Sequence, residues 1–210
     1  MKTCGSILYC LCGLSLLLSA QTALQTFKSQ DGVFQFNYSR VLVHCTQQSE
    51  KGYSGSWIPA DECSSQDGIC DDASSSATAI ACFAYPKAKF KEKPTFIAAA
   101  FFVAEVEEAA TAKACLSGSQ NWFVEGTQRA KINGVEFKVF HISDAWTSGG
   151  QTGDIYRAFH NEQCYELGIQ AASTSSGAYD PGTFKEFTKR DWEEVQGQLR
   201  QPLNSFRFLK

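Results

Sequence analysis

The stretch DECSSQDGICDD, residues 61–72, combines two cysteines with five carboxylates. Carboxylates and thiolates are the side chains that bind metal ions, and paired cysteines carry out redox chemistry or form a disulfide that holds a loop. Cys63 and Cys70 flank Asp67-Gly68, a dipeptide that favours a tight turn. The spacing of the surrounding residues distinguishes these uses.

The spacing argues against a metal site in this stretch. If Gly68 were the glycine of an EF-hand loop, the first and last ligand positions would fall on Cys63 and Ser74, and only Asp67 would match. Zinc sites and thioredoxin-type redox sites use C-x2-C pairs, and the chain contains none. We therefore expect a Cys63–Cys70 disulfide, with a Ca²⁺ site or a pair of free thiols as the alternatives.

The first twenty residues have the layout of a secretory signal peptide. Lys2 precedes an apolar stretch at residues 7–18, and small residues follow up to Ala23. Cleavage is expected after Ala20 or Ala23, and the alternative is an uncleaved anchor. No later segment is long and apolar enough to span a membrane. The sequence thus predicts a secreted or periplasmic protein.

Six cysteines follow this leader, and an even number in an oxidising compartment is typical of a disulfide framework. Six cysteines allow 15 connectivities, so the sequence leaves the pairing open beyond Cys63–Cys70. The six are Cys45, Cys63, Cys70, Cys82, Cys115 and Cys164.

The net charge of the chain disfavours some classes of partner, and its length predicts the number of domains. Without the leader's lysine the chain has 18 basic and 22 acidic side chains, a net charge of −4. This balance argues against a nucleic-acid or anionic-membrane partner, both of which require a basic surface. Residues 24–210 have the length of one domain, which we expect to be a monomer with an unidentified protein or envelope partner.

Catalytic candidates are few. His160 and Cys164 flank the turn HNEQC and could form a nucleophile pair, or half of a zinc site completed by His44 or His141. We expect Cys164 to form a disulfide and His160 to be a solvated turn residue. The chain has no G-x-S-x-G, H-E-x-x-H or glycine-rich phosphate loop. No catalytic, cofactor-binding or metal-binding residue is therefore predicted, and no cofactor is expected.

Apolar periodicity predicts a sheet. Alternating aromatic residues predict a strand at 33–39, which an Asp-Gly turn pairs with 26–29 in a hairpin. Two segments, 78–85 and 95–106, are apolar at both alternating sets of positions. Such strands are covered on both faces and lie in the centre of a sheet.

Helical signals flank a predicted three-strand meander within residues 130–173. A short helix is expected at 107–118. A longer C-terminal helix is expected to begin at the capping-box spacing of Thr183 and Glu186 and to end before Pro202. This order predicts an α+β protein, a single-domain α/β/α sandwich with a central, mostly antiparallel sheet and a long C-terminal helix.

A polar, cysteine-bearing loop is predicted at 46–78. Loops of this length in compact domains are often functional. Together with the 143–153 hairpin tip, it forms the expected contact surface. Its candidate residues are Trp57, Trp146, Asp61 and Asp67.

The segments DGVFQFNYS, YRAFHNEQCYELGIQA and LNSFRF resemble, in their order and aromatic pattern, the PsbP-like and DcrB-like domains over residues 24–209. The resemblance implies a single α/β/α domain and a non-catalytic accessory role, as in an extrinsic photosystem subunit, envelope lipoproteins and a Ran-binding nuclear protein. These families share no functional residue set. The six cysteines and the loop at 46–78 depart from the pattern.

The expected function is therefore that of an extracytoplasmic, disulfide-stabilised accessory or binding domain that is not an enzyme. The alternative is an extracytoplasmic metal-binding protein or hydrolase that uses His160 and the loop carboxylates. A structural envelope protein whose cysteines cross-link chains is a third possibility.

Overall fold

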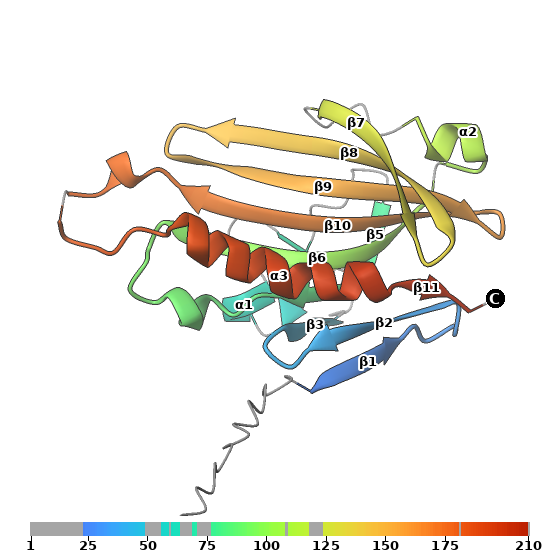
Figure 1. Ribbon diagram of the computed structural model, residues 1–210, viewed down its shortest axis with the longest axis horizontal. Coiled ribbons are helices and arrows are strands. Elements are labelled where there is room, and N and C mark those ends of the chain that lie inside the picture. Colours follow the sequence, from blue (N-terminus) through green and yellow to red (C-terminus); the bar gives the residue numbers. More distant parts are fainter. Residues whose placement is uncertain are drawn as a thin grey trace, which may run out of the picture.

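Figure 1 shows the computed structural model. It describes residues 23–48, 56–58, 60–63, 69–70, 77–107, 109–117, 124–180 and 182–209. The predicted signal peptide at 1–20 lies outside the described residues, as does Asp67. In the described part, no helix has the length and apolar character needed to cross a membrane.

The largest element is an eight-stranded sheet with the order β4-β3-β5-β6-β10-β9-β8-β7, and all its described strand pairs are antiparallel. The consecutive pairing of β7 to β10 confirms the predicted meander and adds a strand to it. The strands are β3 (Val43–Gln48), β4 (Ser56–Ile58), β5 (Ala77–Ala84), β6 (Phe96–Val106), β7 (Val124–Ile132), β8 (Val135–Trp146), β9 (Gly149–His160) and β10 (Gln163–Thr174).

A three-stranded sheet with the order β1-β2-β11 lies beside the long helix α3 (Figure 1). It contains the predicted N-terminal hairpin and a strand from the C-terminus. Its strands are β1 (Leu24–Lys28), β2 (Phe34–Ser39) and β11 (Arg207–Phe208).

The described helices of the protein are α1 (Ala60–Cys63), η1 (Lys87–Phe90), α2 (Ala112–Cys115), η2 (Ser176–Ala178) and α3 (Lys189–Ser205).

The α+β, single-domain class predicted from the sequence is confirmed. The expected central strands are central, because β6 pairs with both β5 and β10 and is buried along most of its length. The segment expected to be one loop at 46–78 contains two short elements, β4 and α1.

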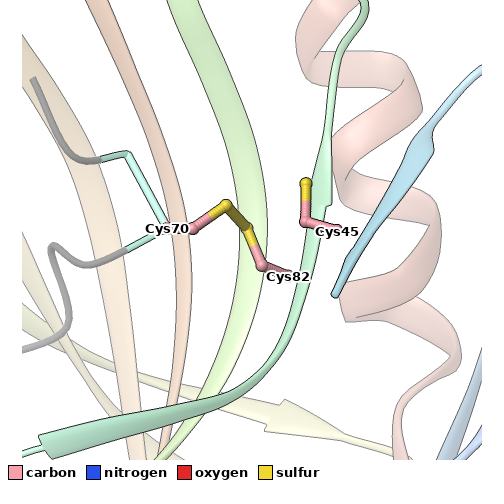
Figure 2. A group of neighbouring side chains, drawn as sticks. All are labelled: Cys45, Cys70 and Cys82. Atoms are coloured by element: carbon pink, nitrogen blue, oxygen red, sulfur yellow. A yellow bond between two sulfur atoms is a disulfide. The ribbon is translucent and has the colours of Figure 1, made fainter. Parts of the chain in front are cut away.

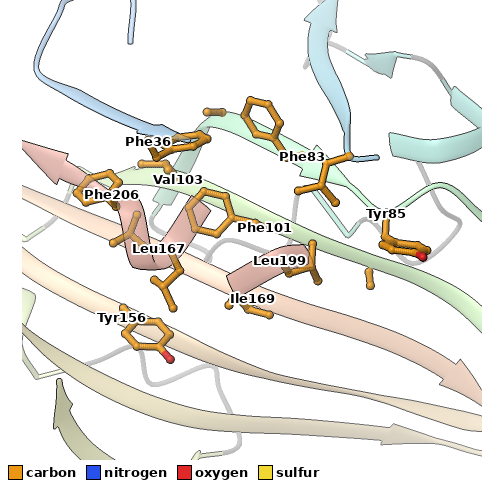
Figure 3. Close-up of a cluster of buried hydrophobic side chains, with 14 of the residues drawn as sticks. Phe36, Phe83, Tyr85, Phe101, Val103, Tyr156, Leu167, Ile169, Leu199 and Phe206 are labelled. Carbon is orange, nitrogen blue, oxygen red and sulfur yellow. The ribbon is translucent and has the colours of Figure 1, made fainter. Parts of the chain in front are cut away.

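The main core lies between the large sheet and the layer formed by α3 and the small sheet (Figure 3). Phe36 of β2 and Phe101 of β6 make an edge-to-face contact, with ring centroids 5.1 Å apart. Leu199 of α3 packs against the same core and is fully buried. Burial of each such side chain stabilises the fold by about 1.5–3 kcal/mol, so the long C-terminal helix is held by its apolar face.

The opposite face of the large sheet carries a second apolar cluster that includes Trp57 and four disulfide-bonded cysteines. The described helices on this face have only one turn each. The predicted helix at 107–118 is wrong in extent, because α2 begins where the Thr111 hydroxyl caps it by accepting a hydrogen bond from Ala114 N at 3.2 Å.

The start of α3 also differs from the prediction. The capping box is formed by Thr188 and Asp191, five residues after the predicted pair: Asp191 N donates to Thr188 Oγ1 at 3.3 Å, and Thr188 N donates to Asp191 Oδ2 at 2.7 Å. At the other end the helix continues through Pro202 to Ser205. Proline removes one backbone hydrogen bond, and burial of Pro202 and Leu203 holds the last turn in place.

Candidate functional site

The cysteines of the stretch at 61–72 do not bond to each other. Cys63 bonds to Cys45 of β3 and Cys70 bonds to Cys82 of β5, so the predicted Cys63–Cys70 pairing is wrong. The third disulfide joins Cys115 to Cys164. The Asp67-Gly68 turn signal is local, whereas the pairing follows the neighbouring strands β3 and β5, which place Cys45 and Cys82 directly opposite each other.

Three of these sulfur atoms, those of Cys45, Cys70 and Cys82, lie within 4.8 Å of one another (Figure 2). Such a group could bind a metal ion only as thiolates. All three are disulfide-bonded and buried, so in this redox state the cluster is a structural staple. Both cysteines of the stretch at 61–72 are therefore attached to the large sheet by disulfides.

The alternative site based on His160 and Cys164 is not formed. Cys164 is bonded to Cys115 and cannot act as a nucleophile or a zinc ligand. The His160 ring stacks on Phe208, with centroids 3.9 Å apart. His160 thus contributes to the attachment of the C-terminal strand.

A cavity of about 510 Å³ lies between the N-terminal hairpin and strands β3, β5 and β6. This volume is in the range of small-ligand sites, roughly 300–1,000 Å³. Its lining combines aromatic rings with carboxylates, and no lysine or arginine is among its described residues. The lining residues are Phe27, Ser29, Gln30, Asp31, Phe34, His44, Cys45, Thr46, Gln47, Trp57, Thr78, Ala79, Ile80 and Glu105.

The hairpin turn positions Asp31 at the cavity. Gly32 has a φ of 70°, a conformation that favours glycine, and Val33 N donates a hydrogen bond to Asp31 Oδ1 at 3.0 Å. The Ser29 hydroxyl accepts a hydrogen bond from Phe34 N at 3.0 Å and closes the turn from the inside. The same Asp-Gly signal that predicted the hairpin therefore also fixes a carboxylate at the cavity.

Glu105 reaches the cavity from β6, where it is the charged exception in a buried apolar strand. Partial burial raises the pKa of its carboxyl group, and the negative charges of Asp31 and Glu107 raise it further. On the neighbouring strand, burial first and then Glu105 and Asp31 raise the pKa of Tyr165. Asp31 and Glu105 therefore add negative charge to one partly buried cavity.

Aromatic side chains also lie in and beside the cavity lining. The His44 ring stacks on Phe83 with centroids 4.6 Å apart and meets the Phe27 ring edge-on at 5.2 Å. Burial lowers the pKa of His44, which favours the neutral ring. With carboxylates and π-systems in one lining, the cavity suits a cationic or amphipathic group.

The predicted contact residues differ in how exposed they are in the structure. Trp57 is only 3% exposed, so its prediction as an exposed contact residue is wrong, although it is among the residues that line the cavity. Trp146 is partly exposed near the β8–β9 turn, paired with Gly149. Asp61 belongs to α1, and the position of its side chain lies outside what the structure describes, as does all of Asp67.

Asp31 and Glu105 are not among the site residues predicted from the sequence. The available signal was a glutamate that interrupts the apolar strand at 95–106. A charge in a strand that is otherwise buried on both faces is costly unless it faces solvent or a cavity. That signal could have singled out Glu105, but not its proximity to Asp31, which depends on the packing of the hairpin.

A second hollow, of about 260 Å³, lies beside α3. His141 Nδ1 is 2.5 Å from Asp154 Oδ1, and Arg200 of α3 lies 4.0 Å from the other carboxylate oxygen. A carboxylate at Nδ1 orients the ring and leaves Nε2 for another partner, an arrangement found in both catalytic and structural settings. On the same strand as His141, the Ser143 hydroxyl donates to Glu125 Oε1 at 2.6 Å.

No family model matches the chain, and no curated protein matches it. Its fold is similar to the solution structure of PsbP (CyanoP) from Synechocystis sp. PCC 6803, with 9% identity, a TM-score of 0.43 and coverage of 99% of this chain and 98% of that one. It is also similar to the Ran-binding protein Mog1p of Saccharomyces cerevisiae, with 10% identity, a TM-score of 0.41 and coverage of 90% and 97%. The element order suggested the same kind of fold, and a similarity this distant transfers no function.

Proposed function

We propose that this protein is an extracytoplasmic, disulfide-stabilised binding domain without catalytic chemistry, and that its acidic, aromatic cavity receives a cationic group from a protein partner. The observation that carries the proposal is the lining of the cavity, which brings Asp31 and Glu105 together with aromatic side chains and contains no lysine or arginine among its described residues.

The pairing of the cysteines supports the proposed extracytoplasmic location. All six cysteines that follow the predicted leader are paired in three disulfides, and each of them is almost fully buried. Disulfides of this kind form and persist in oxidising compartments. The predicted signal peptide is in agreement with this, and both observations support the proposed location outside the cytoplasm.

The raised pKa of Glu105 supports the class of ligand. Partial burial, and then the charges of Asp31 and Glu107, disfavour a negative charge on Glu105, and a bound cation would compensate for both. The side chains of Phe27 and His44, whose rings meet edge-on, add apolar and π-surface to the same cavity. A lysine side chain combines an apolar stem with a terminal cation and matches both features.

The test compares two ligands that differ only by the terminal ammonium group, Nα-acetyl-lysine amide and Nα-acetyl-norleucine amide. Binding is measured by two-dimensional NMR titration of the protein at pH 7 and low ionic strength. We expect the lysine derivative to bind roughly five- to tenfold more tightly, with the largest shift changes at Thr78 and His44. Equal affinities for the two ligands would contradict the proposal.

Two variants test whether the preference for the lysine derivative arises in the cavity. Glu105→Gln is expected to remove the preference for the lysine derivative while it retains the weak affinity for norleucine amide. Glu136→Gln is the matched control, because it removes the same charge from β8 outside the cavity lining. If Glu136→Gln reduces the preference as much as Glu105→Gln does, the preference comes from the net charge of the protein and not from the cavity.

A further inference from the structure

A third cavity, of about 440 Å³, lies at the β7–β8 edge of the large sheet, next to Leu116 at the end of α2. Arg129 of β7 and Lys138 of β8 line it, together with Thr127 and Glu136. Because its lining differs entirely from that of the acidic cavity, an inference drawn here does not depend on the proposed function.

The strand register places like charges directly opposite each other at this cavity. Arg129 is the partner of Lys138, and Lys138 is in turn the partner of Arg157 on β9. The next residue in this row, Glu166 of β10, binds Arg157 through Oε2, at 2.9 Å from Nε and 2.8 Å from Nη2. Glu166 is thus engaged with the buried arginine, and the row of four has an excess of two positive charges.

The next cross-strand pair on the same face of the sheet joins opposite charges, which is the usual arrangement. Lys131 of β7 lies opposite Glu136 of β8, so its charge faces an opposite charge across the strands. Arg129 and Lys138 form no ion pair within the described part of the chain. The ammonium group of Lys138 lies 5.0 Å from the centroid of the Phe140 ring.

Like charges directly opposite on an antiparallel pair destabilise a sheet, whereas opposite charges stabilise it. A bound anion would convert this repulsion into two attractions. The guanidinium group binds oxyanions through two parallel N–H groups, and the lysine ammonium adds a point charge. We propose that Arg129 and Lys138 form a binding site for an oxyanion of the phosphate or sulfate class.

The experiment measures the thermal unfolding of the full chain in inorganic phosphate and in chloride at equal ionic strength, so that general screening is the same in both. Phosphate is expected to raise the Tm in a saturable manner, because a ligand that binds only the folded state stabilises it. Arg129→Gln and Lys138→Gln are each expected to weaken phosphate binding at least about tenfold.

Lys131→Gln is the matched control, with the same charge change on the same strand but opposite Glu136. It is expected to retain the phosphate effect. Lys138→Gln is also expected to raise the Tm in chloride, because it removes the repulsion, whereas a purely structural lysine would lower it. The proposal fails if phosphate and chloride give the same Tm in the wild type, or if Lys131→Gln removes the effect as fully as Arg129→Gln.

Vesicles distinguish two sources of the anion. Cosedimentation with phosphatidylcholine vesicles that contain phosphatidic acid, lost in Arg129→Gln and Lys138→Gln, would identify a lipid headgroup. Stabilisation by inorganic phosphate without such cosedimentation would identify a soluble oxyanion. Absence of both effects would overturn the site.

Discussion

Cys45 and Cys82 lie directly opposite each other on the antiparallel strands β3 and β5, yet each is bonded to a different cysteine, Cys63 and Cys70. The two disulfides therefore lie side by side and attach the segments at 60–63 and 69–70 to the sheet. This arrangement leads to the first prediction.

Peptide mapping under non-reducing conditions is expected to give Cys45–Cys63, Cys70–Cys82 and Cys115–Cys164, with no free thiol in the mature protein. The intact mass would then be six hydrogens lower than that of the reduced chain. Recovery of a Cys63–Cys70 bridge, or of free thiols at these positions, would contradict the arrangement.

The two tryptophans that were predicted as contact residues should differ in their effect on stability. Trp57 is 3% exposed within the second apolar cluster, so Trp57→Ala is expected to lower the free energy of unfolding by about 3–5 kcal/mol. Trp146 is partly exposed at the end of β8, and Trp146→Ala should cost less than about 1 kcal/mol. Urea unfolding measures both, and equal losses would disprove the difference in burial.

Glu105 should make the folded state less stable as pH rises. Its pKa in the folded state is raised above the usual 4.5, so between these two values the folded state binds more protons than the unfolded state. Stability is therefore expected to fall as pH increases through this window. Glu105→Gln should remove that part of the pH dependence and gain up to about 1 kcal/mol at pH 7.

Denaturant unfolding between pH 4 and pH 7 measures this effect by comparing wild type with Glu105→Gln. The difference in the free energy of unfolding should grow with pH. A difference that stays constant with pH would show that Glu105 has the same pKa in the folded and unfolded states.

Asp191 should have the opposite effect to Glu105, because it makes the folded state more stable as pH rises. Its burial alone would raise the pKa, but hydrogen bonds from Lys93 and Thr188 outweigh this and lower it from 3.8 to about 2. The unfolded state then binds more protons between these values, so this stabilisation is present above pH 3.8 and is lost as pH falls towards 2.

Asp191→Asn is expected to cost about 1 kcal/mol at pH 7, because solvent screens part of the ion pair with Lys93 and the amide retains part of the helix cap. At pH 2 the cost should be much smaller. Chemical denaturation at the two pH values tests this, and an equal cost at both would refute the role of the charge.

Arg157 and Glu166 form an ion pair on the α2 side of the sheet that is almost completely buried. Glu166→Ala would leave a buried guanidinium without its carboxylate and should destabilise the fold by about 3–5 kcal/mol. The double variant Arg157→Met, Glu166→Leu should be more stable than Glu166→Ala, because it removes both charges. A double variant that is less stable than the single one would contradict this explanation.

Local patterns predicted some of these elements and not others. The hairpin, the apolar central strands and the meander depend on period-two alternation and turn residues, which act over a few neighbouring positions. The capping box was placed at Thr183 and Glu186, and the structure has it at Thr188 and Asp191. Both spacings satisfy the local rule, and the tertiary contact of Asp191 with Lys93 is present only at the second.

The sequence by itself determined the α+β class, the antiparallel central sheet and the even set of six cysteines, because composition, periodicity and spacing carry this information locally. Only the tertiary structure decided which cysteines pair, that Trp57 is buried, and that Asp31 and Glu105 share one cavity while Arg129 faces Lys138 at another. These features join residues that are far apart in the chain. They depend on strand order, register and the side of the sheet on which each segment packs, and a single sequence records none of these directly.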